Sequence, residues 1–209
     1  KRIEDKGGCF LLHTNNGTYG SNFVIWAAGE YQYPSTHSFE GEHLCTHYSE
    51  VGSFADVMGK NSVVIGAYES GFDAAINLAL VGKEVTLIDN SNYAELIKSD
   101  SSYSLSPFTR DRMREALDDI EYYAETRVEK VKFENAQYLV TTDDGQTFVS
   151  DDEPINCTGF DTSLKLVKEL FEFEEGYALL NGFDESRKPL YQKLLGTQVK
   201  HRPQNICIC

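Results

Sequence analysis

The residues best suited to chemistry lie in a glycine-containing turn that joins an apolar run to a helical pattern. The turn follows Val63–Ile65 and consists of Gly66, Ala67, Tyr68, Glu69, Ser70 and Gly71. A helix that begins here directs free backbone N–H groups toward the end of the preceding strand, where they bind an anion such as a pyrophosphate. Gly66 permits the sharp turn, Ser70 adds a hydroxyl, and Gly71 allows either close helix packing or a close pyrophosphate approach.

Tyr68 stands in place of the middle glycine of the pattern GxGxxG. A side chain there would crowd the closest approach of a pyrophosphate, so we expect altered or weakened binding. The alternative is that the glycines of this turn serve packing alone.

Asp89 ends the second apolar run of the same unit. A carboxylate at this place accepts hydrogen bonds from the ribose of an adenosine and repels a 2′-phosphate, so the pattern favours NADH over NADPH. Asn90, Ser91 and Lys98 lie close enough in sequence to change that preference. The alternative is that Asp89 is a solvated strand end.

A β-α-β unit of about thirty residues would position these groups. Val63–Ile65 is a continuous apolar run of the kind that parallel sheets bury on both faces, and Glu84–Ile88 returns as the second strand. Between them, apolar residues recur at helical spacing, and Gly82 stands where a glycine ends a helix. The apolar residues are Phe72, Ala75, Ile76, Ala79 and Leu80.

Shorter elements are expected on both sides of this unit. Asn16 and Gly17 indicate a hairpin within 1–29, where we expect paired strands, and Cys207 and Cys209 alternate as in a strand. Further predicted elements are a helix at 110–119, strands at 128–133, 137–142, 147–150 and 152–160, and a helix at 163–171. The fold class is therefore α/β, with a Rossmann-like three-layer nucleotide-binding domain that carries a small β-meander.

Composition narrows the classes of partner. The formal net charge of −14 and the pI of about 4.7 disfavour nucleic acid and anionic membranes and favour a small molecule. No run of eighteen apolar residues and no signal-peptide pattern is present, so we expect no membrane insertion and a cytoplasmic protein. The five cysteines include no CxxC pair, which fits a reducing compartment.

Three segments resemble the pyridine-nucleotide flavoproteins, in particular the flavin-containing monooxygenase-like or thioredoxin-reductase-like branch found beside cation-diffusion transporters. They are FVIWAAGEYQYP at 23–34, VVIGAYESGFDAA at 63–75 and INCTGF at 155–160. The first and third resemble the Ala-Thr-Gly turns of that family, and the second resembles its nucleotide turn. The tail GTQVKHRPQNICIC is similar to the segment that returns to the flavin. We therefore expect a fragment that lacks the family's N-terminal FAD motif.

The resemblance implies FAD-domain pieces at 1–32 and 155–209 and an NAD(P)-binding Rossmann-like domain at 33–154. It implies hydride transfer from NAD(P)H to FAD in the full-length protein, and from there to oxygen, a disulfide or another acceptor. It is also compatible with a homodimer. If the family's residue roles hold here, the turn at 66–71 would line the pyrophosphate. Asp89 and Asn90 would then lie at the ribose. The domains and cofactors would meet at Ala28, Gly29, Thr158 and Gly159, although the first turn lacks the usual threonine hydroxyl.

Other interpretations remain open at this point. The chain could be a non-catalytic NAD(P)-binding module, or a methyltransferase, which also combines a glycine turn with an acidic strand end; the two Ala-Thr-Gly-like turns oppose the latter. If extended, His43, Cys45 and His47 would share one face, but no fourth metal ligand follows, and we predict no metal. Glu69 could serve at the hydride site, but Glu69 and Asp73 fit better as solvated carboxylates that complement the helix dipole.

Overall fold

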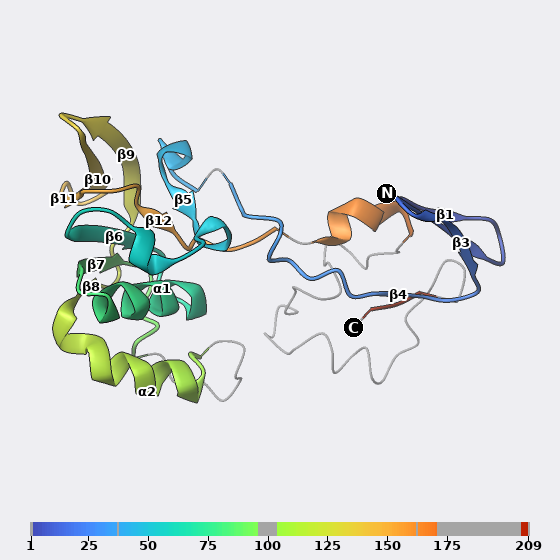
Figure 1. Cartoon of the computed structure of the whole chain (residues 1–209), viewed down its shortest axis with the longest axis horizontal. Helices are drawn as coiled ribbons and strands as arrows, with labels where there is room; N and C mark the ends of the chain where they lie inside the picture. Colours follow the sequence, from blue (N-terminus) through green and yellow to red (C-terminus); the bar gives the residue numbers. More distant parts are fainter. Residues whose placement is uncertain (1, 37, 96–103, 162, 171–205, 209) are drawn as a thin grey trace. The chain divides into compact units, whose positions relative to one another are not determined.

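The structure is a computed structural model that describes residues 2–36, 38–95, 104–161, 163–170 and 206–208. Its contacts divide the chain into two compact units, which are described separately (Figure 1). One unit comprises Tyr31–Asp161, and the other combines Lys1–Glu30 with Thr162–Cys209. None of the described helices is long and apolar enough to cross a membrane.

The unit Tyr31–Asp161 is built on a parallel sheet. Among the described residues, this sheet has five strands in the order β5-β12-β6-β7-β8. They are β5 (Thr46–His47), β12 (Ile155–Asn156), β6 (Asn61–Ile65), β7 (Glu84–Ile88) and β8 (Ile120–Tyr123). Since β7 and β8 lie on one side of β6 and β12 lies on the other, the strand order reverses next to β6.

The two faces of this sheet are covered differently (Figure 1). Two helices, α1 (Glu69–Leu80) and α2 (Pro107–Ala116), lie on one face, and an antiparallel meander lies on the other. The meander consists of β9 (Val128–Glu134), β10 (Gln137–Thr142) and β11 (Thr147–Ser150). The predicted three-layer α/β fold with a β-meander is therefore confirmed.

Alternate residues of the central strands supply the two buried cores between these layers. The helix-side core includes Val64, Leu87 and Ile155 of the sheet together with Phe72 and Met113 of the helices. The meander-side core contains Val63, Ile65, Ile88, Val128, Val131 and Val140. This is the pattern of a parallel sheet buried on both faces, as the continuous apolar runs indicated.

The predicted β-α-β unit forms as expected. Helix α1 ends in a Schellman motif, because the Lys83 N–H donates to the Leu78 carbonyl at 3.1 Å and the Gly82 N–H to the Ala79 carbonyl at 2.9 Å. Gly82 has a φ of +83°, which favours glycine. Leu80 is a local exception to the apolar pattern: its side chain is 72% exposed, because the helix turns it away from the sheet.

Helix α2 begins earlier than the sequence pattern indicated. It starts at Pro107 instead of Arg110, and 3₁₀ turn η5 (Leu117–Asp119) follows its last residue, Ala116. The hydroxyl of Ser106 accepts a hydrogen bond from the Thr109 N–H at 3.2 Å, so Ser106 caps the helix and Pro107 occupies the first helical position. Short 3₁₀ turns also precede β6: η1 (Glu42–Leu44), η2 (Tyr48–Glu50) and η3 (Phe54–Asp56).

The other unit contains an antiparallel sheet and a parallel strand pair. The sheet consists of β1 (Arg2–Asp5), β2 (Phe10–Thr14) and β3 (Gly17–Ser21), with the predicted hairpin between β2 and β3. Strand β4 (Val24–Trp26) pairs with β13 (Ile206–Ile208), which contains Cys207. Cys209 lies outside the described residues.

A 3₁₀ segment replaces the helix predicted at 163–171. This segment, η6 (Ser163–Leu170), is interrupted at Val167, whose backbone leaves the helical region. The hydroxyl of Ser163 accepts a hydrogen bond from the indole of Trp26 at 3.1 Å, and Leu170 packs against buried Phe10 and Val24. Position 171 lies outside the described residues.

Close packing between α1 and β6 depends on Gly71. A Cβ atom at Gly71 would lie 1.8 Å from the carbonyl oxygen of Gly66, so the helix has no room for a side chain there. We expect Gly71→Ala to lower the free energy of unfolding by about 3 kcal/mol, because backbone must move to relieve the overlap. Urea denaturation measures this change. Gly52→Ala is the control, since a Cβ there meets nothing within 4 Å; equal losses in both variants would contradict the packing role.

Candidate functional site

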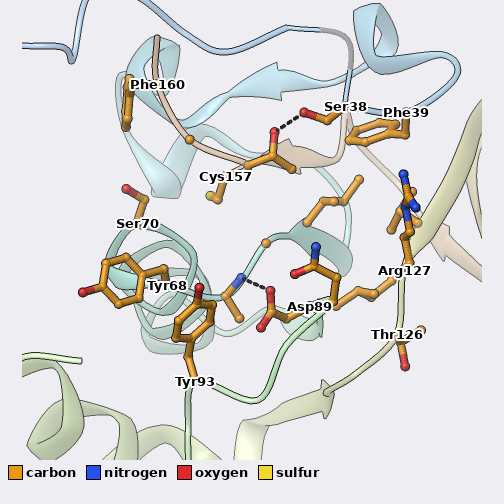
Figure 2. Close-up of a pocket in the computed structure, with 18 residues that line it drawn as sticks. Ser38, Phe39, Tyr68, Ser70, Asp89, Tyr93, Thr126, Arg127, Cys157 and Phe160 are labelled. Atoms are coloured by element: carbon orange, nitrogen blue, oxygen red, sulfur yellow. Dashed lines mark hydrogen bonds between the residues drawn. The ribbon is translucent and has the colours of Figure 1, made fainter. Parts of the chain in front are cut away.

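A cavity of about 500 Å³ opens at the carboxyl ends of β6, β7 and β12 (Figure 2). It lies where the strand order reverses, which is the usual ligand position in open α/β sheets. The lining residues come from the turns after these strands and from two loops. They are Ser38, Phe39, Ile65, Gly66, Ala67, Tyr68, Ser70, Ile88, Asp89, Asn90, Tyr93, Thr126, Arg127, Val128, Cys157, Thr158, Gly159 and Phe160.

The turn after β6 is held against the turn after β12. The Gly66 N–H donates to the Ile88 carbonyl at 2.7 Å, and the Cys157 N–H donates to the Ile65 carbonyl at the same distance. Gly66 has a φ of +93°, and a Cβ atom there would lie 2.7 Å from the Cys157 carbonyl oxygen. Gly71 does not line the cavity, so of its two predicted roles the geometry supports helix packing.

Tyr68 departs from the glycine pattern without covering the turn. Its ring contacts the ring of Tyr93, with 4.9 Å between the centroids, and its hydroxyl donates to the Ser104 carbonyl at 3.2 Å. Figure 2 shows both rings on the wall of the cavity. Tyr68 provides no side-chain cap for α1, and Ser70 follows on the cavity side. The first turn of α1 therefore faces the cavity without a capping side chain from Tyr68, an arrangement that suits an anion.

Asp89 is a buried carboxylate with one unused oxygen. Its side chain is 4% exposed, and Oδ1 accepts a hydrogen bond from the Ala67 N–H at 3.3 Å. Its Oδ2 atom has no hydrogen-bond partner among the described residues. Burial raises the pKa of Asp89, while backbone N–H groups, that of Ala67 first, oppose this effect. A buried acceptor without a partner, in a residue that lines the cavity, fits a ligand that donates hydroxyl hydrogens.

The turn after β12 is anchored by the segment that precedes the sheet. The Thr158 and Ser38 hydroxyls are 2.9 Å apart and hydrogen-bonded. The Gly159 carbonyl accepts from the Ser35 N–H at 3.0 Å, and it lies 3.0 Å from Nε2 of His47. These contacts hold Thr158 and Gly159 at the cavity. The other predicted turn, Ala28 and Gly29, belongs to the other unit, and its role at the meeting of two cofactors stays a prediction.

Cys157 lines the cavity without the features of a nucleophile. Its side chain is buried, and burial raises the pKa of its thiol. The thiol is therefore neutral near pH 7, and Cys157 acts here as a small packing residue.

Glu69 and Asp73 are not the solvated carboxylates that the sequence suggested. Glu69 accepts hydrogen bonds from the Ser106 N–H and from the Thr109 hydroxyl, so it binds the first turn of α2 and does not line the cavity. Asp73 accepts from the Tyr48 hydroxyl at 2.8 Å and forms an ion pair with Arg112 at 2.5 Å. Both carboxylates therefore join α1 to neighbouring elements.

His43, Cys45 and His47 do not share an extended strand. His43 lies in η1, Cys45 follows it, and His47 is buried in β5 with its Nδ1 atom 2.9 Å from the Ser49 hydroxyl oxygen. Within the part of the chain that the structure describes, no group of three or more acidic, histidine or cysteine side chains is arranged to hold a metal ion.

Several lining residues carried no periodic signal in the sequence. Phe39 and Arg127 lie in loops, and Tyr93 follows the end of β7, whereas Phe160 stands at the end of the strand predicted at 152–160. Arg127 directly precedes the predicted strand at 128–133, so its place at a strand end is the one signal that could have drawn attention to it.

A glycine turn after one parallel strand and an acid after the next, at the reversal of strand order, define a Rossmann-class α/β domain. The chain belongs to the pyridine nucleotide-disulphide oxidoreductase family, whose model matches residues 1–189. This confirms the resemblance that the three sequence segments indicated.

Relatives of this chain include disulfide reductases. The bacilliredoxin reductase Bdr of Bacillus subtilis (strain 168) is 35% identical over 92 residues, which are 43% of this chain and 28% of that protein. The structure of the bacillithiol disulfide reductase Bdr (YpdA) from Bacillus cereus is 17% identical in sequence and matches with a TM-score of 0.65. The match covers 100% of this chain and 60% of that protein. The structure of thioredoxin reductase from Lactococcus lactis is 16% identical in sequence and matches with a TM-score of 0.62. The match covers 86% of this chain and 60% of that protein. The chain thus spans 28% to 60% of these relatives.

The contact between Glu69 and α2 predicts a local stability effect. In many helices, a glutamate at the third helical position accepts a hydrogen bond from the N–H of the N-cap residue. In α2 the N-cap is Ser106 and the third position is Thr109, so Glu69 of α1 accepts from the Ser106 N–H instead. We expect Glu69→Ala to cost about 1–2 kcal/mol of unfolding free energy and to accelerate hydrogen exchange at the start of α2. Glu115→Ala removes the same charge from an exposed position of α2 and serves as the control. Unchanged exchange at Ser106 in Glu69→Ala would contradict this role.

Proposed function

We propose that the unit Tyr31–Asp161 binds a nicotinamide dinucleotide, and that the whole protein uses it to pass hydride to FAD. The supporting observation is Asp89, which lines the cavity and whose buried Oδ2 atom lacks a partner among the described residues. A ribose supplies hydroxyl donors for such an acceptor. The family membership supports the same class of ligand.

Each part of the dinucleotide has a proposed place in the cavity. The pyrophosphate would lie at the first turn of α1, between Gly66 and Ser70, where the backbone N–H groups and the helix dipole favour negative charge. The adenosine ribose would donate to Asp89, and Asn90 would lie beside it. The nicotinamide end would then extend toward Thr158 and Gly159. In this direction the reacting ring would lie near the turn after β12.

The buried charge of Asp89 favours NADH over NADPH in this proposal. A 2′-phosphate would bring negative charge against the buried carboxylate of Asp89, whose Oδ2 atom has no partner among the described residues. The 2′-hydroxyl of NADH would donate to that carboxylate instead. We therefore propose NADH as the preferred donor.

FAD and the final acceptor are proposed from the family. Bound FAD would supply a flavin N5 atom that accepts the hydride. Of the pieces expected at 1–32 and 155–209, residues 1–30 and 162–209 would contribute to its domain, because 155–161 belong to the unit Tyr31–Asp161. The names of the relatives, bacilliredoxin reductase and bacillithiol disulfide reductase, favour a disulfide as acceptor over oxygen. We further propose a reducing, cytoplasmic location, in keeping with the free thiols of Cys9, Cys45 and Cys157.

Ser70→Asp tests the proposed pyrophosphate position. A carboxylate in the first turn of α1 complements the helix dipole, so we expect folding to be retained. The same charge would repel the pyrophosphate, and NADH affinity should fall more than about tenfold. Calorimetric titration of the whole chain measures both NADH and NADPH. Ser70→Ala is the control and should lower affinity less than Ser70→Asp, because it removes one hydroxyl without adding a charge; NADH binding by Ser70→Asp at the affinity of the unchanged protein would refute this position.

The raised pKa of Asp89 predicts a pH dependence of binding. Ribose hydroxyls that donate to Oδ2 favour the ionised carboxylate, so the bound protein has a lower Asp89 pKa than the free protein. Affinity should therefore fall as the pH drops through the pKa of the free protein, with uptake of a proton when the ligand leaves. Calorimetry with NAD⁺ measures this acid limb. The contribution of Asp89 to this limb should be lost in Asp89→Asn, which leaves only the titration of the adenine ring; an unchanged limb in that variant would rule out Asp89 as its source.

A further inference from the structure

A second hollow of about 260 Å³ adjoins the cavity beyond Asp89. Its walls are Ser38, Phe39, Arg127, Val128, Glu129 and Asp143. The first four of these residues also line the larger cavity, so the two spaces share a wall. Figure 2 shows Phe39 and Arg127 at the end of the cavity away from Ser70 and Phe160, with Asp89 between the two ends.

Phe39 is held at this end by a backbone bridge to β9. The Glu40 N–H donates to the Glu129 carbonyl at 3.1 Å, and the Val131 N–H donates to the Glu40 carbonyl at 2.8 Å. The ring of Phe39 is partly buried against the meander-side core. One side of the ring is therefore fixed by packing, and the residue presents a rigid apolar wall to both hollows.

Arg127 is fixed through its backbone, while its side chain is left exposed. The neighbouring Thr126 N–H donates to the Asp89 carbonyl at 2.8 Å, and the Arg127 carbonyl accepts from the Asp143 N–H at 2.9 Å. Within the described parts of the chain, the guanidinium has no ion pair. Among the described residues that line the two hollows, Arg127 is the only positively charged one. An exposed guanidinium without an ion pair among the described residues is unusual in a chain whose net charge is −14.

We propose that Phe39 and Arg127 form a slot for the purine base of the bound dinucleotide. The inference rests on the proposed function: with the pyrophosphate at Ser70 and the ribose on Asp89, the base continues away from the helix toward Phe39 and Arg127. A planar base stacks on an aromatic ring, and a guanidinium packs on the opposite face by cation–π attraction. The slot therefore selects the adenosine half of the ligand by the flat shape of its base.

The slot predicts a loss of affinity when the guanidinium is removed. Arg127→Met retains most of the unbranched side chain and removes the charge and the planar group. We expect its NADH affinity to fall about five- to tenfold in calorimetry, and Phe39→Leu to show a similar loss. Arg114→Met removes the same group from an exposed position on α2 and should bind as the unchanged protein does. Thermal melting of each variant verifies that it folds.

Ethenoadenine NAD⁺ reports on the base itself. Its fluorescent base should be shielded from acrylamide in the unchanged protein and accessible in Arg127→Met and Phe39→Leu. Binding of NADH without a change in either variant would overturn the slot and leave the proposed function standing. A loss for NADPH that greatly exceeds the loss for NADH would show that Arg127 serves a phosphate, which also overturns the slot. Failure of the unchanged chain to bind either nucleotide would instead refute the proposed function, and the slot with it.

Discussion

The contact between helix α1 and the ends of β6 and β12 is the constraint on which the rest of the site depends. Gly71 lies against the Gly66 carbonyl, and Gly66 lies against the Cys157 carbonyl, so neither position has room for a Cβ atom. This contact brings the first turn of α1 to the place where the strand order reverses. Both glycines are required for packing before any ligand is bound, and glycine spacing alone therefore cannot separate a nucleotide site from a packing motif.

Asp89 is the residue that favours a nucleotide site over a packing motif. A buried carboxylate with an unsatisfied oxygen destabilises the empty protein, and packing alone gives no reason to keep it. Its backbone accepts from the Thr126 N–H and its Oδ1 atom from the Ala67 N–H, so the side chain is held in place and not left to rotate toward solvent. Buried, perturbed groups of this kind concentrate at binding sites.

Local patterns predicted the β-α-β unit because both of its strands and its helix bury apolar residues at regular spacing. The sequence pattern missed the start of α2 because Ser106 and Pro107 signal a helix through capping and not through periodicity. Glu69 was misread for a different reason: its partners come from the first turn of α2, far along the chain. Periodicity could not place Arg127 and Phe39, since loops carry no period and the neighbours of these residues are set by the packing of the meander.

The cavity is a property of one unit of the chain. All of its lining residues lie within Tyr31–Asp161, and Asp73 ties α1 to both α2 and η2 through Arg112 and Tyr48. Its walls are thus held by contacts inside that unit. Binding of a dinucleotide, as proposed, would need only this unit, whereas passing hydride onward would also need the flavin and therefore the rest of the protein. Affinity and turnover are consequently separate physical questions, and the proposed site bears on affinity alone.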